Sequence, residues 1–289
     1  MSLAPETDLA DDLGGAAATE RLQGIPFARA IGMTATRCGG GTARSTVPFR
    51  GAFAIQPGDD RFCEGIIAAV ADQAGSVAIW SRLGLAFPHA TVSLSLTFLA
   101  PARGACLAFD AALLADAGGL GQTSVTVVQP DGREVARGSV DFALGSYPGD
   151  AGASTTRPIA DPAKVGEQII EELEAADVYA GLGLEPLGET DHRLPYRVNL
   201  AGSRDPLALH GGAIAAAGAA SARAALAPPD GWRIIQLSVD YLRSGLPEPA
   251  DLHARIVSRT RRTALVEVDV RQASGTRLVA RMRVRFHSQ

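Results

Sequence analysis

Two short segments of the sequence carry residue types that could do chemistry together. Asp72 lies within an apolar run, Ile66 to Trp80, whose neighbours leave little room for a solvated helix face. His210-Gly211-Gly212 opens a second, Ala-rich run, Gly211–Leu226. A carboxylate held there could act as a general base or as a nucleophile. Unpaired N–H groups at a helix N-terminus, which glycine lets a substrate approach closely, stabilise negative charge on a carbonyl oxygen.

The two segments occupy different copies of an internal repeat, which begins as a gapless alignment over residues 48–75 of the first copy. In the second copy, Ala219 takes the place of Asp72. In the first copy, Cys63-Glu64-Gly65 takes the place of His210-Gly211-Gly212. A repeat of this kind decides the fold before any local pattern does. Each copy lacks one of the two parts, so a site that needs both could be built only once, from one half of each copy.

Composition narrows the classes of protein to consider. The chain has 289 residues, of which 46% are hydrophobic and 20% charged, as in a globular protein of two similar halves. A net charge of −4 argues against a general binder of nucleic acid. The three cysteines fit a reducing cytoplasm better than a disulfide framework. The apolar run is too short to span a bilayer, and the N-terminus has no signal-peptide pattern, so we expect a cytoplasmic protein with no membrane partner.

The elements that position these residues follow one plan in both copies. A helical lead-in, around residues 25–31 or 165–179, and an extended segment precede a long helix, Glu64–Leu83 or Gly211–Leu226. Four strand-like runs follow each helix, at 91–99, 105–114, 122–128 and 134–144 in the first copy and at 234–242, 250–258, 264–271 and 277–286 in the second. The alternation over Leu265–Val270 is typical of a sheet with one solvated face. The fold class is therefore α+β, with an antiparallel sheet wrapped around each long helix.

Domain boundaries follow from the repeat and from composition. We expect a mobile leader over residues 1–20, an N-terminal repeat over 21–147, an interdomain linker over 148–163 and a C-terminal repeat over 164–289.

With these elements in place, the chain resembles the hotdog-fold acyl-CoA thioesterases of the phenylacetate-pathway type. His210-Gly211-Gly212 matches the family's opening of the central helix, and Val70-Ala71-Asp72 matches its acid one helix face later. Thr97–Pro101 matches the strand that ends in an aromatic residue and proline. The resemblance covers the chain apart from the leader and the linker. It implies two tandem hotdog repeats, packed as a pseudo-dimer with antiparallel central helices.

The resemblance also implies one thioester-hydrolysing site between the repeats, with acyl-CoA as the substrate. Asp72 would be the general base or the nucleophile, Gly211 and Gly212 would donate to the oxyanion, and Thr91 would orient the acid or the water. His210 is expected to serve as a structural or substrate-binding residue. Coenzyme A is part of the substrate, and no separate cofactor is implied.

Several features of the sequence bear on this hypothesis. The equivalent site, where Glu64 meets Ala219, lacks the acid and is predicted to be inactive. Relatives carry an asparagine six residues before the histidine, whereas this chain has Arg204. Three arginines on a predicted hairpin could grip the phosphates of coenzyme A or simply face solvent: Arg259, Arg261 and Arg262. The five histidines show no metal-ligand spacing, so no metal site is predicted.

Two other functions remain open. One is a catalytically inert acyl-CoA-binding or regulatory module. The other is a hotdog hydratase or dehydratase, which usually needs an Asp–His pair at short helical spacing; Ser76 and Val77, four and five residues after Asp72, do not supply it. Double-hotdog chains commonly pair further, so we also expect a homodimer.

Overall fold

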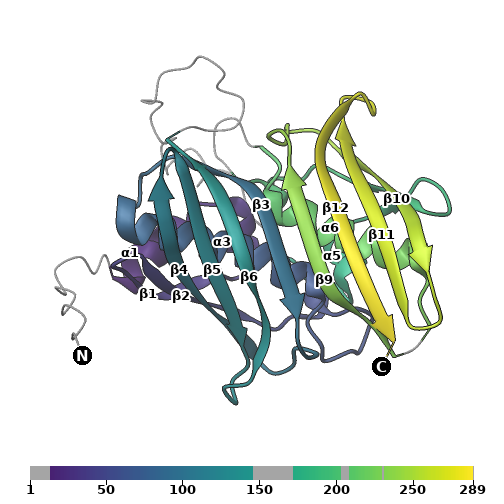
Figure 1. Cartoon of the computed structure of the whole chain (residues 1–289), viewed down its shortest axis with the longest axis horizontal. Coiled ribbons are helices and arrows are strands. Elements are labelled where there is room, and N and C mark those ends of the chain that lie inside the picture. The colour runs from purple at the N-terminus through teal and green to yellow at the C-terminus, as the bar shows by residue number, and fades with distance from the viewer. Residues whose placement is uncertain (1–13, 146–171, 203–207, 230, 289) are drawn as a thin grey trace.

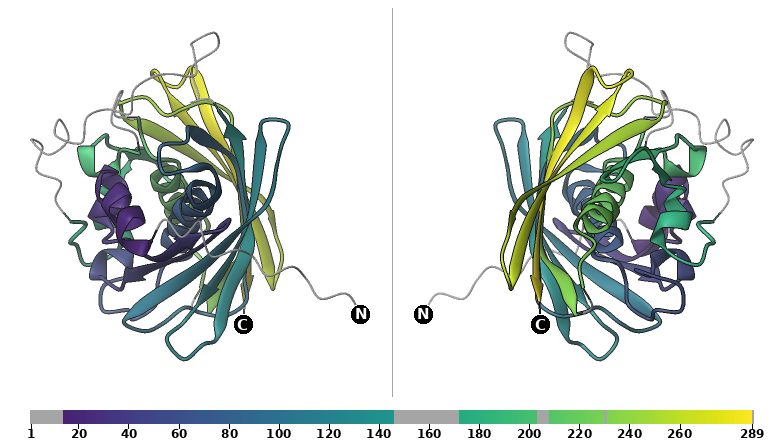
Figure 2. Two further views of the ribbon diagram at one scale, coloured as in Figure 1. Left: turned by 90° about the vertical axis from the view of Figure 1, so that its left-hand side faces the viewer. Right: turned by 90° about the vertical axis from the view of Figure 1, so that its right-hand side faces the viewer.

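Two long helices, α3 (Glu64–Leu83) and α6 (Gly211–Leu226), run side by side through the centre of the molecule (Figure 2). The computed structural model describes residues 14–145, 172–202, 208–229 and 231–288. Both helices are buried over almost their whole length. Their own residues are mostly alanine, glycine and branched apolar residues on every face, so no face needs to meet solvent. Both have the bounds that the sequence predicts. No helix among the described residues is long and apolar enough to cross a membrane.

The described strands form one twelve-stranded antiparallel sheet in the order β1-β2-β4-β5-β6-β3-β9-β12-β11-β10-β8-β7 (Figure 1). Strands of the first repeat make one half of the sheet and strands of the second make the other, and the sheet curves around α3 and α6 (Figure 2). The strands of the first repeat are β1 (Thr34–Gly39), β2 (Thr42–Pro48), β3 (His89–Phe98), β4 (Cys106–Ala117), β5 (Leu120–Val128) and β6 (Glu134–Leu144). Those of the second are β7 (Glu185–Pro186), β8 (Asp191–Leu194), β9 (Trp232–Tyr241), β10 (Ala250–Arg259), β11 (Thr263–Gln272) and β12 (Arg277–Ser288).

The repeats join where β3 pairs with β9. Ser95 lies opposite Ser238, and these are equivalent positions of the repeat, so a pseudo-twofold axis passes through this pair. The predicted α+β fold of two repeats packed as a pseudo-dimer is therefore confirmed.

Glycines let the two central helices approach closely. A Cβ atom at Gly65 would lie 3.0 Å from the Cα atom of Ala216, and a Cβ atom at Gly212 would lie 3.0 Å from the Cα atom of Ala69. The two contacts are related by the repeat and show that the helices run antiparallel. Any side chain at either glycine would push the helices apart.

Two expectations at the repeat borders need correction. Residues 15–20, predicted as part of a mobile leader, form the start of helix α1 (Gly15–Gln23), in which Ala18 is fully buried. Of the second predicted lead-in, 165–179, residues 165–171 lie outside the described residues and 172–177 are not helical; helix α5 (Val178–Leu182) begins where the Asp177 side chain accepts a hydrogen bond from Ala180 N. The first lead-in is present as α2 (Pro26–Ala30). The predicted linker and Arg204 lie outside the described residues.

Candidate active site

A buried carboxyl group from one repeat meets a helix N-terminus from the other. Asp72 lies in the third turn of α3 and is only 3% exposed. Its Oδ1 atom accepts a hydrogen bond of 2.6 Å from the hydroxyl of Thr91 on β3. A Cβ atom placed on Gly211, the first residue of α6, would lie 3.3 Å from Asp72 Oδ2. The structure thus brings Asp72, Thr91 and Gly211 together.

Burial controls the charge of Asp72. Desolvation raises the pKa of this carboxyl group to about 6, against the opposing effects of the Thr91 hydroxyl and the Gly212 N–H. Desolvation likewise lowers the pKa of His210 to about 4, so the imidazole is neutral at pH 7. Asp72 can therefore be ionised at neutral pH and can still take up a proton readily, as a general base must.

His210 is the N-cap of α6 and is held from both sides. Its Nδ1 atom accepts a hydrogen bond of 2.7 Å from Gly212 N, so the proton of the neutral ring sits on Nε2. That Nε2 atom lies 2.9 Å from Oε1 of Gln73, to which it donates. The Gly212 N–H is already bonded, and Gly212 packs against α3, so its geometry supports a structural role in place of the predicted oxyanion donor.

The backbone N–H of Gly211 is available as a hydrogen-bond donor to an oxyanion. Its carbonyl oxygen accepts a hydrogen bond of 2.9 Å from the hydroxyl of Tyr241, at the end of β9. Its N–H has no hydrogen-bond partner within the described residues. As the first N–H of α6, close to the Asp72 carboxylate, it is the group best placed to bind a developing oxyanion.

Gln73 and Tyr241 belong to the site but were not predicted from the sequence. Gln73 was visible only as a second polar residue inside the apolar run. Tyr241 corresponds in the repeat to Phe98, the aromatic residue at the end of β3, and this equivalence was the signal that could have placed it beside Gly211.

The hairpin arginines do not come to this site. Arg259, Arg261 and Arg262 lie at the turn between β10 and β11, and the Arg259 guanidinium donates to the carbonyl oxygen of Leu226 at the last residue of α6. Gly211 is at the other end of this 16-residue helix, roughly 22 Å away. Their placement gives no support to the predicted grip on coenzyme A.

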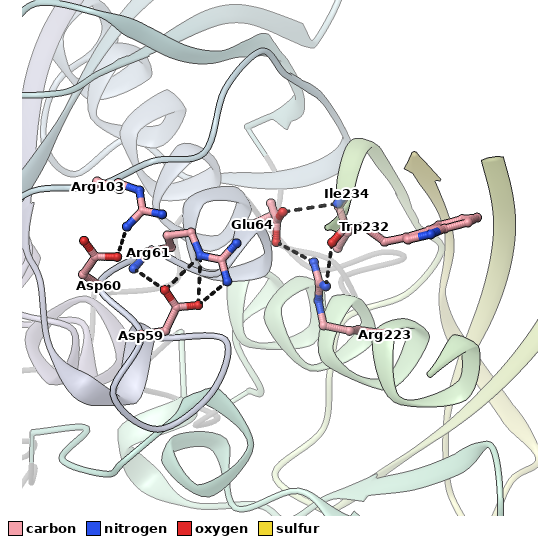
Figure 3. A network of polar contacts seen from close by, with 8 residues as sticks. All are labelled: Asp59, Asp60, Arg61, Glu64, Arg103, Arg223, Trp232 and Ile234. Carbon is pink, nitrogen blue, oxygen red and sulfur yellow. Dashed lines mark hydrogen bonds and ion pairs between the residues drawn. The ribbon is translucent and has the colours of Figure 1, made fainter. Parts of the chain in front are cut away.

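The repeat-related site has a different composition. Glu64 occupies the place of Gly211; its Oε2 atom lies 3.1 Å from Nη2 of Arg223 and its Oε1 atom accepts from the N–H of Ile234 (Figure 3). Ala219, in place of Asp72, packs against Gly65. Burial, as the largest effect, raises the pKa of the neighbouring Cys63 thiol to about 11. No described acid of this site takes the place of Asp72.

Comparisons with known proteins bear on the family and on the fold. Residues 201–287, which contain α6 and β9 to β12, match a family model described as the acyl-CoA thioesterase N-terminal domain. A search of curated protein sequences found no significant match.

Solved structures show the same fold over both repeats. The tesB protein of Mycobacterium avium subsp. paratuberculosis has a TM-score of 0.56 at 15% identity, over 85% of this chain and 93% of that one. A 12:0-ACP thioesterase from Umbellularia californica gives 0.59 at 11% identity, over 86% and 95%. A hotdog-fold protein of unknown function from Alicyclobacillus acidocaldarius gives 0.55 at 14% identity, over 85% and 93%. At these identities the likeness is one of fold.

The fold and the helix-to-helix site define a double-hotdog protein. The C-terminal repeat is similar in sequence to an acyl-CoA thioesterase domain over residues 201–287, and the solved structures confirm the predicted hotdog fold. The phenylacetate-pathway subtype stays a prediction.

Proposed function

We propose that the protein hydrolyses acyl-CoA thioesters at one site, formed by Asp72 and Thr91 of the first repeat and Gly211 of the second. The observation that carries the proposal is that a buried carboxyl group with a raised pKa lies beside Gly211, the first residue of α6, whose N–H has no hydrogen-bond partner within the described residues. Perturbed carboxyl groups in such surroundings are typical of catalytic sites.

In the proposed reaction, Gly211 stabilises the developing charge and Asp72 carries the proton. The thioester carbonyl oxygen accepts the Gly211 N–H, which stabilises the negative charge that forms on this oxygen. Asp72, held by Thr91, takes the proton of an attacking water molecule. Collapse of the tetrahedral intermediate breaks the C–S bond, and the thiolate leaves with the proton that Asp72 returns. In the nucleophilic variant, Asp72 attacks first and water then cleaves the mixed anhydride.

Hydrolysis in ¹⁸O-labelled water identifies the nucleophilic variant when label is retained on Asp72. In a single turnover, direct attack by water puts the label in the released acid. Attack by Asp72 puts an oxygen of the enzyme's carboxylate in the product when water cleaves the anhydride at the Asp72 carbonyl, and Asp72 then retains the label.

The pseudo-symmetric position is proposed to be catalytically inactive. Glu64 places a carboxylate where the oxyanion would need a donor, and Ala219 supplies no acid. The homodimer and the cytoplasmic location remain proposals that sedimentation analysis and cell fractionation would test.

Thiol release from a panel of short, medium and aromatic acyl-CoAs tests the proposal. We expect turnover by the wild type and by Glu64→Gln, and its collapse in Asp72→Asn. Equal turnover in the wild type and Asp72→Asn would remove Asp72 from the mechanism. Saturable thioester binding without turnover would instead favour the acyl-CoA-binding module.

A further inference from the structure

A cavity of about 450 Å³ lies on the inactive side, between the N-terminal end of α3 and the C-terminal end of α6. Its volume is within the range of pockets that hold small organic ligands. Its wall is mixed, with charged side chains beside apolar or aromatic residues that include Ile55, Phe62, Ile67, Ala224 and Trp232.

Three arginines also line the cavity, and two of them are paired with carboxylates. Arg61 bonds Asp59 at 2.6 Å, and Arg223 bonds Glu64 at 3.1 Å (Figure 3). The third, Arg233, has no carboxylate partner among the described residues. Within the described part of the chain, its positive charge is therefore not balanced by a direct ion pair.

The guanidinium of Arg233 is fixed in place but not saturated. Its Nη1 and Nη2 atoms donate to the carbonyl oxygens of Phe98 and Leu99, at 3.1 and 3.3 Å. Its Nε atom is buried without a partner, as is the Nε atom of Arg223. Because both bonded acceptors are neutral carbonyl oxygens, the guanidinium keeps its positive charge, which can attract an anion in the cavity.

The internal repeat supplies a comparison within the same molecule. At the equivalent positions on the Asp72 side, the three arginines are replaced by Ala208, Ser76 and Ala90. The two copies share the fold but not this charge. Helix packing and sheet pairing therefore do not by themselves require arginine at these places.

We propose that this cavity binds a small amphipathic monocarboxylate, with its carboxylate on Arg233 and its hydrocarbon part against the apolar part of the wall. The guanidinium fork matches a carboxylate in geometry and charge. The nearby carboxylates of Glu64 and Asp177 would repel a multiply charged group such as the phosphates of coenzyme A. The acid released by thioester hydrolysis belongs to this chemical class, but the binding site is separate from Asp72 and does not depend on turnover.

Calorimetric titration of the full chain with octanoate tests the proposal. We expect saturable binding to one site per chain, weakened about tenfold or more in Arg233→Gln, because a charge-assisted contact is lost. Arg243→Gln is the matched control, since this exposed arginine also donates to a backbone carbonyl, that of Leu278, and does not line the cavity.

Two further variants make the result specific. Ala224→Leu keeps every charge and places another good helix former, but takes up part of the cavity, so it should also weaken binding even if Arg233→Gln folds poorly. Asp72→Asn should bind octanoate as the wild type does, whether or not the protein is a thioesterase. Absence of binding, binding that ignores both Arg233→Gln and Ala224→Leu, or an Arg233-dependent preference for coenzyme A over octanoate would each overturn the proposal.

Discussion

Asp72 combines two properties that are rarely found in one carboxyl group. It is buried between two apolar helices, and few groups stabilise its charge. The Thr91 hydroxyl is the nearest of these, and the Gly212 N–H adds to it. The fold therefore holds a carboxyl group whose ionised form is destabilised. Such an arrangement costs stability, and a catalytic site is where this cost is usually found.

The first prediction concerns the loss of folding stability that the buried Asp72 carboxylate causes. The pKa of Asp72 is about 6 in the folded protein and near the ordinary aspartate value of 3.8 in the unfolded chain. The folded state holds the proton more tightly, so stability falls as pH rises from 4 to 6 and is constant above. Asp72→Asn should therefore be more stable than the wild type above pH 6, on the order of 3 kcal/mol, with a smaller difference near pH 4. Urea unfolding at several pH values measures this. A difference that does not change with pH would contradict it.

The second prediction is the pH dependence of turnover. The ionised form of Asp72 is needed as base or as nucleophile, so kcat/KM should rise with pH and level off above an apparent pKa of about 6. Thr91→Val removes a hydrogen bond that lowers this pKa. Its profile should move to higher pH by about one pH unit. An unshifted profile with a lower plateau would assign Thr91 to water positioning instead.

At the scale of elements, the two adjacent glycines at the start of α6, Gly211 and Gly212, have different roles. Gly65 and Gly212 are equivalent in the repeat, and both allow the helix crossing. Gly211 has Glu64 as its counterpart and lies at the site, not at the crossing. Packing and chemistry are thus divided between adjacent residues of one motif.

The third prediction separates these tasks. Gly212→Ala would place a Cβ atom 2.9 Å from the backbone oxygen of Ala69, so it should destabilise the fold by about 1–3 kcal/mol. Gly65→Ala is the matched control and should destabilise without touching the site, because its Cβ atom would lie 2.8 Å from that of Ala219. Gly211→Ala meets Tyr241 and Asp72 at 3.2 to 3.3 Å, and should lower kcat more than stability. Thermal unfolding and thiol-release assays of the three variants decide this.

The fourth prediction concerns the Glu64–Arg223 ion pair, whose side chains are 11% and 12% exposed. Arg223→Met leaves a nearly buried carboxylate without its cation, which should destabilise the protein by about 3 kcal/mol. Adding Glu64→Gln should recover part of that loss, because the amide still reaches the Ile234 N–H without a charge. A double-mutant cycle in urea measures the coupling. Additive losses would show that the pair does not act as a unit.

The elements could be predicted from the sequence because their signals are local and repeated. The bounds of α3 and α6 follow from apolar, Ala-rich runs that occur once in each copy of the repeat. The meeting of Asp72 with Gly211 could be predicted only through the resemblance. The hydrogen bond that occupies Gly212 N, the role of Gln73 and the position of the hairpin arginines depend on tertiary contacts that one sequence does not encode locally.

At the scale of the whole molecule, the repeats share both layers of the structure. The sheet passes from one repeat to the other through β3 and β9, and the two central helices pack against each other beneath it (Figure 1). The proposed active site and the proposed carboxylate site both lie between α3 and α6. We therefore expect the two repeats to unfold together, although each has the plan of a separate domain.

The fifth prediction tests this cooperativity at the pseudo-twofold axis. Ser238 pairs with Ser95 on one side and Arg283 on the other, so Ser238→Pro removes a ladder donor from the centre of the sheet. Calorimetry should show one transition for the wild type, with equal calorimetric and van't Hoff enthalpies, and one transition at lower temperature for the variant. Glu185→Pro, on the edge strand β7, should change it little. One transition is expected because the two repeats share one sheet and one helix core. Two transitions in the wild type would contradict this and show that the repeats unfold independently.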